Sequence, residues 1–310
     1  PTAAVVDRDE RIKGGYVLEP QPGIYDNIIV LDFKSLYPSI MRTFNIDPYA
    51  FAAAKKSKKK TEVIEAPNGA CFAREEGILP RLIQSLWEER DAAKKRKDPL
   101  TSYAIKIMMN SIFGITANPA YRFYSLDMAN AITSFGRFFI QRAAAQAQEQ
   151  GYKVIYGDTD SCFINPQEKD TKKATAIGKE IQQHLNANLT SFIKKTYQRQ
   201  SFLEVQFEKV FKKFFLPHIR KKEEGAKKRY AGLIEVDGKE EIIYVGLETV
   251  RRDWTALAKK FQQALLDRVF HNQEIEKFIK SFVQELRQGK YNDLLVYRKG
   301  IRKGVEEYTK

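Results

Sequence analysis

The stretch Gly157-Asp-Thr-Asp-Ser161 does most to decide the fold of this chain. It lies between two apolar segments, residues 152–156 and residues 162–164. A short polar segment between β-prone runs predicts a hairpin, which would hold its carboxylates at the tip of a rigid two-stranded ribbon. Turns are polar in most proteins, so a single aspartate here could simply be a turn former.

A second segment of the same kind favours a shared site. Asn27-Ile-Ile-Val-Leu31 is a buried-strand run that ends in Asp32 and continues as Phe33-Lys-Ser-Leu-Tyr-Pro-Ser-Ile40. Asp32 and Asp160 are 128 residues apart (160 − 32), and each lies at the end of a β-prone run. The chain therefore has two candidate carboxylates at the ends of predicted strands.

The composition points to a polyanionic partner. The 310 residues suffice for one large core or for two or three small ones, and the net charge is +14. A basic protein of the membrane surface would have a similar charge. However, the sequence has no run of 18 apolar residues and no strongly amphipathic segment, so we expect no membrane partner.

The cysteines and histidines predict neither a zinc site nor a disulfide framework. Cys71 and Cys162 stand alone, and the three histidines are scattered. This pattern is typical of a protein of the reducing cytoplasm, and the charged N-terminal segment does not resemble a signal peptide.

The hydrophobic pattern predicts a mixed order of strands and helices. Residues 1–24 read as an N-terminal linker, 27–32 as a strand, and the residues after Pro38 as a short helix. The lysine-rich run 55–60 reads as a solvated loop in preference to a specific contact. We further expect helices at 78–97, from about 101 to 111, at 125–149 and near 172–196, and strand-like regions at 202–215 and 230–244. The tail from Thr255 should be helical, with an apolar face of Phe261, Leu265, Leu266, Val269 and Phe270.

The helices near 78–97 and 101–111 form a predicted antiparallel pair, because Asp98-Pro99 must interrupt the first. Leu79, Leu82, Ile83 and Leu86 would form the core face of the first helix, and Ile105, Met108, Met109 and Ile112 that of the second. Lys106, Asn110 and Phe113 share another stripe at i, i+4 and i+7. Arg90 and Lys94 are a pair at i, i+4 that is either a solvated face or, together with Lys106, a clamp for a triphosphate.

Four motifs resemble those of family B DNA polymerases. Residues 32–40 (DFKSLYPSI) are similar to motif A of that family, 106–114 (KIMMNSIFG) to motif B, and 156–161 (YGDTDS) to motif C, in the family's order. Lys227-Lys-Arg-Tyr230 is similar to its basic primer-side motif. The resemblance runs from about residue 12 to the C-terminus, and the wording around motif A (GGYV at 14–17, PGIY at 22–25, RTFNIDP at 42–48) is most similar to the bacterial DNA polymerase II branch.

The resemblance implies an α+β fold: an antiparallel-sheet palm, a helical-hairpin fingers element and a partial, mainly helical thumb. The implied boundaries are 1–74 and 122–248 for the palm, 75–121 for the fingers and 249–310 for the thumb. The N-terminal and exonuclease domains that usually precede this region in the family are not in the sequence. We therefore expect a polymerase-core fragment or one part of a split enzyme, whose partners would be those domains or a complementary subunit, and we assign no proofreading to it.

The resemblance also implies the site. Asp32 and Asp160 would bridge two Mg²⁺ ions (Mn²⁺ is possible), with the Phe33 carbonyl as a further ligand, and the two carboxylates would repel each other without cations. Asp158 is a weaker catalytic candidate that would set turn geometry or tune the primer end. The implied dNTP-binding residues are Ser35, Leu36, Tyr37, Arg90, Lys94, Lys106, Asn110 and Phe113, and the implied DNA-binding residues are Gly14, Gly15, Thr159, Lys227, Lys228, Arg229 and Tyr230.

Two positions depart from the family pattern. Phe113 replaces the usual tyrosine of motif B, which keeps base stacking but removes a hydroxyl that would reach the minor groove. Ile12-Lys-Gly-Gly15 replaces the usual Tyr-x-Gly-Gly.

The expected function is template-directed addition of dNTPs to a primer 3′-hydroxyl on DNA, in the cytoplasm and associated with the nucleoid. One alternative is a catalytically silent subunit that grips primer–template, but the motif carboxylates are all retained. A two-metal nuclease is the other alternative, and it leaves Tyr37, Arg90 and Lys106 without a role.

Overall fold

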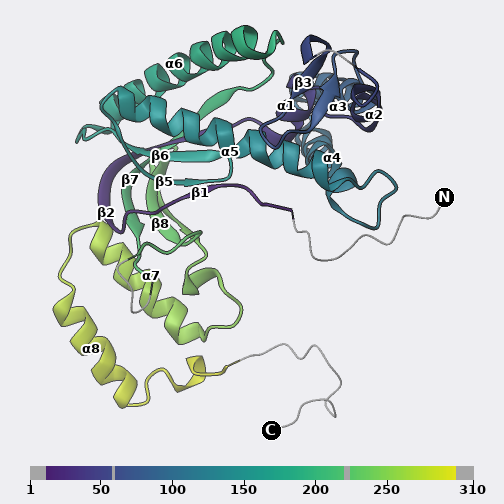
Figure 1. Ribbon diagram of the computed structural model, residues 1–310. Helices are drawn as coiled ribbons and strands as arrows, with labels where there is room; N and C mark the ends of the chain where they lie inside the picture. The colour runs from purple at the N-terminus through teal and green to yellow at the C-terminus, as the bar shows by residue number, and fades with distance from the viewer. Residues whose placement is uncertain (1–11, 58–59, 220–223, 298–310) are drawn as a thin grey trace, which may run out of the picture. The chain divides into compact units, whose positions relative to one another are not determined.

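The computed structural model describes residues 12–57, 60–219 and 224–297, and the chain divides into two compact units (Figure 1). The first unit comprises Pro1–Leu18, Ile29–Pro166 and Lys172–Lys209, and the second comprises Glu19–Ile28, Gln167–Thr171 and Val210–Lys310. The N-terminal linker up to residue 11, lysines 58 and 59 and the tail from residue 298 lie outside the described residues.

A sheet with the strand order β1-β5-β6-β2-β7 forms the centre of the first unit, which contains β2 from Ile29 and β7 up to Lys209. Its bounds are β1 Val17–Leu18, β5 Lys153–Asp158, β6 Ser161–Asn165, β2 Gly23–Phe33 and β7 Val205–Leu216. The pairs β1–β5, β5–β6 and β2–β6 are antiparallel, and Asp32 pairs with Ser161. This confirms the predicted mixed fold with an antiparallel sheet and the predicted 157–161 hairpin.

Apolar burial explains why these segments are strands. Ile28, Ile29, Val30 and Leu31 are almost fully buried on β2, as the continuous apolar run predicts for a strand covered on both faces. The β5–β6 turn is Thr159-Asp160, and Thr159 adopts a left-handed φ of 59°. The Thr159 N–H donates to the Tyr16 carbonyl at 2.9 Å, which ties the tip of the hairpin to the segment before β1.

Two long helices, α5 Leu126–Glu149 and α6 Thr171–Tyr197, pack on this sheet (Figure 1). Ser125 caps α5 by accepting the Met128 N–H at 3.3 Å. Gly178 of α6 lies so close to β7 that a Cβ there would come within 2.7 Å of the Phe207 ring. The helices enclose an aromatic cluster of Phe44, Phe135, Phe139, Phe192 and Tyr197, whose closest ring pair, Phe44–Phe135, has centroids 3.8 Å apart.

The remaining helices of the first unit are α1 Leu36–Thr43, α2 Pro48–Ala54, α3 Ile78–Lys95 and α4 Pro99–Ala117. A short 3₁₀ turn at Lys60–Glu62 and a small hairpin, β3 Val63–Glu65 with β4 Cys71–Ala73, lie between α2 and α3. The Asp47 carboxylate caps two helices at once, because it accepts the Tyr49 N–H at 2.7 Å and the Leu79 N–H at 2.8 Å. Gly77 precedes α3 because a Cβ there would lie 2.5 Å from the Asp47 side chain.

The helices α3 and α4 form the predicted antiparallel pair. Asp98 caps α4 by accepting the Thr101 N–H at 3.0 Å, and Pro99 is the first residue of that helix. Two core predictions were wrong: Met108 is 54% exposed and Leu82 is 44% exposed, because each lies at the edge of its apolar stripe. Leu79, Ile83, Ile105, Met109 and Ile112 are buried as predicted.

The second unit contains the C-terminal part of β7 with β8 Tyr230–Val236 and β9 Lys239–Val245, all antiparallel. The region 230–244 is thus a hairpin, and both of its turn residues, Asp237 and Gly238, have positive φ as a tight primed turn requires. The tail forms the 3₁₀ turns Glu248–Val250 and Asn292–Leu294 and the helices α7 Ala256–Phe270 and α8 Glu276–Arg287. Leu266 and Phe270 of α7 pack on Ala231 and Leu233, and Leu257 packs with Phe282 of α8.

Within the described ranges, no helix has both the length and the apolar character needed to cross a bilayer. Cys71 and Cys162 are both free thiols. Burial and the neighbouring Asp32 charge raise the pKa of the Cys162 thiol to about 12, so this cysteine is a core residue and not a nucleophile.

Candidate active site

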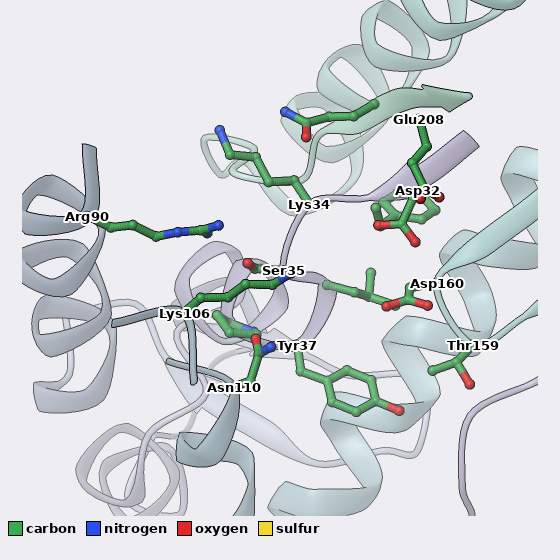
Figure 2. Close-up of a pocket in the computed structure, with 14 residues that line it drawn as sticks. Asp32, Lys34, Ser35, Tyr37, Arg90, Lys106, Asn110, Thr159, Asp160 and Glu208 are labelled. Carbon is green, nitrogen blue, oxygen red and sulfur yellow. The ribbon is translucent and has the colours of Figure 1, made fainter. Parts of the chain in front are cut away.

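A cavity of about 610 Å³ in the first unit brings together residues from β2, α1, α3, α4, the β5–β6 turn and β7. Figure 2 shows the carboxylates of Asp32, Asp160 and Glu208 on one side of it and the cations of Arg90 and Lys106 on the other. The lining residues are Asp32, Phe33, Lys34, Ser35, Leu36, Tyr37, Pro38, Arg90, Lys106, Asn110, Thr159, Asp160, Gln206 and Glu208.

The acidic side is built by the pairing of β2 with the β5–β6 hairpin. Asp32 is the cross-strand partner of Ser161, so it lies beside the turn that carries Asp160. The Phe33 N–H donates to the Asp160 carbonyl at 2.8 Å and locks the two segments together. Two residues that are 128 positions apart in the sequence (160 − 32) therefore line one end of one cavity.

The electrostatics of this side favour a cation. Burial, and then the charges of Asp160 and Glu208, raise the pKa of Asp32 to about 7, although Lys106 and Lys209 act in the opposite direction. The ionised form of Asp32 is thus disfavoured while no positive ion lies among these carboxylates.

The basic side comes from the helix pair. Arg90 lies on α3, and Lys106 and Asn110 lie one turn apart on α4. Within the described chain, no carboxylate lies within 4.0 Å of Arg90 or Lys106. The Arg90 Nε atom is buried and has no hydrogen-bond partner among the described residues. These donors are available to an anion in the cavity.

The turn between β2 and α1 contributes Ser35 and Leu36 to the cavity wall. Ser35 adopts a left-handed conformation with φ 46° and ψ 58°, directly before α1. Lys34 is held on the other side of this turn, because its N–H donates to the Glu204 carbonyl at 2.9 Å and its Nζ donates to the Glu204 carboxylate at 3.1 Å. The Ser35–Leu36 segment is therefore fixed at the start of a helix, where N–H groups commonly bind phosphate.

Tyr37 lies between two helices. Its ring centroid is 4.8 Å from that of Phe113 on α4, and a Cβ on Gly136 of α5 would lie 3.3 Å from the ring. Burial and the nearby Asp160 charge raise the pKa of Tyr37, so its phenol is neutral at physiological pH. Tyr37 therefore forms part of the cavity wall, and Phe113 packs against its ring.

Three of the predicted catalytic and dNTP-binding residues do not line this cavity. Lys94 lies farther along α3 and lines a second cavity, while Phe113 lies behind Tyr37. The Asp158 carboxylate accepts hydrogen bonds from the Thr159 hydroxyl at 3.1 Å and the Tyr156 hydroxyl at 3.4 Å. These contacts are those of a residue that shapes the turn.

The segment with Gly14 and Gly15 lies beside the same hairpin tip. A Cβ on Gly15 would come within 2.8 Å of the Thr159 side chain, so only glycine fits there. The Arg137 guanidinium donates to the carbonyls of Lys13 and Gly14, at 2.9 Å each. The first unit thus brings Gly14, Gly15 and Thr159 together.

The basic motif 227–230 belongs to the second unit. Lys227 pairs with Glu19 at 2.8 Å, and Arg229 pairs with the largely buried Glu248 at 2.5 Å. Lys228 is exposed and has a left-handed φ of 59°, and Tyr230 begins β8 with its ring 5.2 Å from that of Phe214.

Sequence reasoning missed Lys34, Gln206 and Glu208 of the cavity wall. The sequence signal that could have found Gln206 and Glu208 is the alternation in Glu204-Val-Gln-Phe-Glu208, which puts both polar residues on one face of β7. In the described part of the chain, no set of three or more His, Cys, Asp or Glu side chains is grouped to hold a metal ion. Any ion here would therefore depend on the Asp32–Asp160 pair with other oxygen ligands, a donor set that suits Mg²⁺.

Comparison with known proteins identifies the family. The sequence model of DNA polymerase family B matches residues 2–308. DNA polymerase II of Escherichia coli (strain K12) is 40% identical over 301 residues, which cover 96% of this chain and 38% of that protein. A DNA polymerase of Thermococcus gorgonarius is 32% identical over 320 residues, with 97% of this chain and 38% of that protein covered.

A comparison with a solved structure supports the same family. The family B DNA polymerase of Pyrobaculum calidifontis superimposes with a TM-score of 0.66 at 26% identity, over 98% of this chain and 38% of that one. The present chain thus spans well under half the length of these relatives. This chain belongs to DNA polymerase family B.

Proposed function

We propose that this chain is the polymerase core of a template-directed DNA polymerase that adds dNTPs to a primer 3′-hydroxyl. The observation that carries the proposal is the division of one cavity into an acidic end, with Asp32 and Asp160, and a basic end, with Arg90 and Lys106. A triphosphate between these ends would have its reactive phosphorus near the carboxylates and its outer phosphates near the cations.

The residues at the acidic end fit two Mg²⁺ ions, with Mn²⁺ as a substitute. The fit rests on two hard carboxylates, Asp32 and Asp160, beside the Phe33 backbone, in a pocket where burial raises the pKa of Asp32 to about 7. Bound there, the ions would supply a more acidic 3′-hydroxyl and charge neutralisation on the leaving group.

The chain itself would position the nucleotide. Four side chains of the helix pair would bind the phosphates: Arg90, Lys94, Lys106 and Asn110. The amides of Ser35 and Leu36 would donate to the outer phosphates. Nucleotidyl transfer needs in-line geometry more than covalent chemistry from the protein, and cations fixed on two packed helices supply that geometry.

Tyr37 would select the deoxyribose. Its ring is held by Phe113 and by the close approach of Gly136, so it cannot retreat to admit a 2′-hydroxyl. Phe113 would also stack on the nascent base pair.

The DNA-binding assignments complete the proposal. Gly14, Gly15 and Thr159 would contact the DNA in the first unit, and Lys227, Lys228, Arg229 and Tyr230 would hold the primer strand through sequence-independent phosphate contacts. Asp158 would act on the primer end through the turn geometry that it sets.

The domain assignment is part of the same proposal: palm at 1–74 and 122–248, fingers at 75–121 and thumb at 249–310. The partners would be primer–template DNA, dNTPs, and the N-terminal and exonuclease domains of the family or a complementary subunit. Cytoplasmic location and nucleoid association stay predictions. The alternative of a catalytically silent primer–template-binding subunit has no observation that favours it over an enzyme.

Primer extension tests the proposal directly. With Mg²⁺, a labelled primer and single dNTPs, the chain should add the templated nucleotide, and Asp32→Ala or Asp160→Ala should abolish addition while leaving DNA binding within about twofold, because phosphate contacts dominate binding. Asp127→Ala is the matched control, since that aspartate is exposed and lines no cavity described above. Extension by either active-site variant at the normal rate would refute the assignment.

A further inference from the structure

A second cavity, of about 600 Å³, lies between α3 and α4. It shares Arg90 and Lys106 with the first cavity, so the two are neighbours along the helix pair. The proposed catalytic chemistry does not use Lys97, Ser102 and Tyr103, which line its outer part. Its lining residues are Arg90, Lys94, Lys97, Asp98, Pro99, Ser102, Tyr103 and Lys106.

The charge of this cavity is strongly positive. It has four cations and a single carboxylate, Asp98, which is already engaged as the cap of α4 with the Thr101 N–H at 3.0 Å. Lys94 has a loose, exposed pair with Asp91 at 3.7 Å. Across the described residues, Lys97 has no carboxylate within 4.0 Å, as was also found for Arg90 and Lys106.

Lys97 occupies a position that normally favours glycine. It follows α3 with a left-handed φ of 57°, its N–H donates to the Lys94 carbonyl at 3.0 Å, and the Asp98 N–H donates to the Ala93 carbonyl at 2.9 Å. This is the hydrogen-bond pattern of a helix C-terminus that glycine usually closes. A lysine here is conformationally costly, and it adds a cation at the wall of the cavity.

We propose that this second cavity is an outer subsite for polyphosphate, beyond the phosphates held at the first cavity. It would take the phosphate chain that extends past the third phosphate of a nucleotide, or the pyrophosphate that departs from the first cavity. The buried, unpartnered Nε of Arg90 and the unpaired Lys97 and Lys106 supply the hydrogen-bond donors that such an anion requires.

The inference rests on the proposed function. In that reaction the primer 3′-oxygen bonds to the α-phosphorus, the bond from that phosphorus to the bridging oxygen breaks, and pyrophosphate leaves with the bridging oxygen and its electron pair. The hydroxyl proton passes to water. Because the outer phosphates would lie at Arg90 and Lys106, the cavity that shares these cations is the nearest basic surface for the leaving group.

Calorimetric binding to the DNA-free protein tests the subsite without catalysis. The probes are inorganic tripolyphosphate and inorganic orthophosphate, at low salt. We expect Lys97→Glu to weaken tripolyphosphate binding about fivefold or more and orthophosphate binding less than twofold, since only the longer anion reaches Lys97. Lys95→Glu is the control with the same charge change, because Lys95 is exposed on the same helix end and lines neither cavity.

Lys97→Gly is the second variant, and it distinguishes a loss of binding from a loss of folding. Glycine suits the left-handed position, so this variant should melt at the same or a higher temperature than the parent while losing tripolyphosphate affinity. If Lys97→Gly and Lys97→Glu bind tripolyphosphate as tightly as Lys95→Glu does, the outer subsite is overturned. A loss of affinity for single-stranded DNA with no loss for tripolyphosphate would overturn it as well, in favour of a template contact.

Extension assays separate the two sources of the anion. If the subsite receives the leaving group, Lys97→Gly should raise the concentration of pyrophosphate that inhibits extension by about threefold or more. If it receives the tail of a longer nucleotide, Lys97→Gly should lower kcat/KM for a deoxynucleoside tetraphosphate more than for the triphosphate. No extension by any protein, including the parent, would count against the proposed function, whereas normal extension with neither effect would count against this subsite alone.

Discussion

Replacing Asp32 with asparagine should stabilise the metal-free protein at neutral and alkaline pH. The pKa of Asp32 is raised from 3.8 to about 7 by burial and by the charges of Asp160 and Glu208. At about 1.4 kcal/mol per pKa unit, a shift of about three units destabilises the ionised fold by about 4 kcal/mol above pH 7. The side chain is only partly buried, so solvent screening reduces this to about 2 kcal/mol.

The stability difference between the parent and Asp32→Asn should depend on pH. The pKa of Asp32 is higher in the folded state than in the unfolded state, so the folded protein holds the Asp32 proton up to a higher pH. The parent therefore loses stability as the pH rises from about 4 to about 7. The Asp32→Asn variant has a neutral amide at this position at every pH, so it does not follow this loss. The stability gain of the variant should be near zero at pH 4 and should reach about 2 kcal/mol at pH 8.

Urea unfolding with a chelator present measures this difference. The chain has two tryptophans, Trp87 in the first unit and Trp254 in the second. A Trp254→Phe background therefore makes fluorescence report on the unit that contains Asp32. Glu180→Gln is the control, because that exposed glutamate lies on α6 in the same unit, and loss of its charge should change stability by less than about 0.5 kcal/mol.

Magnesium should reverse the order of stability of the parent and Asp32→Asn at pH 8. Added Mg²⁺ should stabilise the parent at pH 8 and have little effect on Asp32→Asn, since the variant lacks half of the carboxylate pair. A variant that is less stable than the parent at pH 8 with chelator, or a gain of equal size at pH 4 and pH 8, would refute the electrostatic reasoning.

The remaining predictions concern the nucleotide. Tyr37→Ala should raise ribonucleotide incorporation by at least about tenfold in single-nucleotide extension, and continued exclusion would remove its role in sugar selection. Lys106→Ala should raise the KM for dNTP about tenfold or more with duplex affinity unchanged, and a loss confined to duplex affinity in gel-shift titration would contradict its placement. Glu204→Gln breaks the 3.1 Å pair with Lys34 and should raise the KM for dNTP by about threefold at unchanged kcat. A double-mutant cycle with Lys34→Met checks the last effect, and additive losses would show that the pair does not position the turn.

The sequence predicted the central elements because their signals are strong and local. The β5–β6 hairpin, the buried run of β2 and the pair of α3 and α4 each have a clear apolar period or a Pro-marked break. The three-residue strands β3 and β4 and the short helix α2 were missed, since a period cannot be read from so few residues. Tertiary hydrogen bonds define them instead, as when the Asn45 side chain donates to the Ala73 and Glu75 carbonyls at 2.6 Å each.

The sequence predicted residues of the first cavity wall mainly where these residues belong to a recognisable motif. Asp32, Tyr37, Lys106 and Asp160 belong to the quoted motifs and line the first cavity. Arg90 lies outside those motifs and was predicted from its place on the helix that faces Lys106. Gln206 and Glu208 escaped prediction because β7 reaches the cavity through sheet order, and no local pattern encodes which strand becomes the neighbour of β2. The role of Lys94 in dNTP binding stays a prediction: this lysine lies one turn beyond Arg90 on α3 and lines the second cavity, which shares Arg90 and Lys106 with the first.

Backbone conformation adds a kind of information that neither motif nor period contains. Ser35 and Thr159 at the first cavity and Lys97 at the second are left-handed although none is glycine, asparagine or aspartate, and each costs about 1 kcal/mol for that reason. The conformation alone does not mark a site, since Gln167 and Gln198 adopt it and line neither of these cavities. What distinguishes Lys97 is the coincidence of a conformational cost, an unpaired charge and a cavity wall, and a glycine there would remove the cost together with the charge. That coincidence is the physical reason to expect an anion at the second cavity, and it makes Lys97→Gly a variant in which stability and polyphosphate affinity should change in opposite directions.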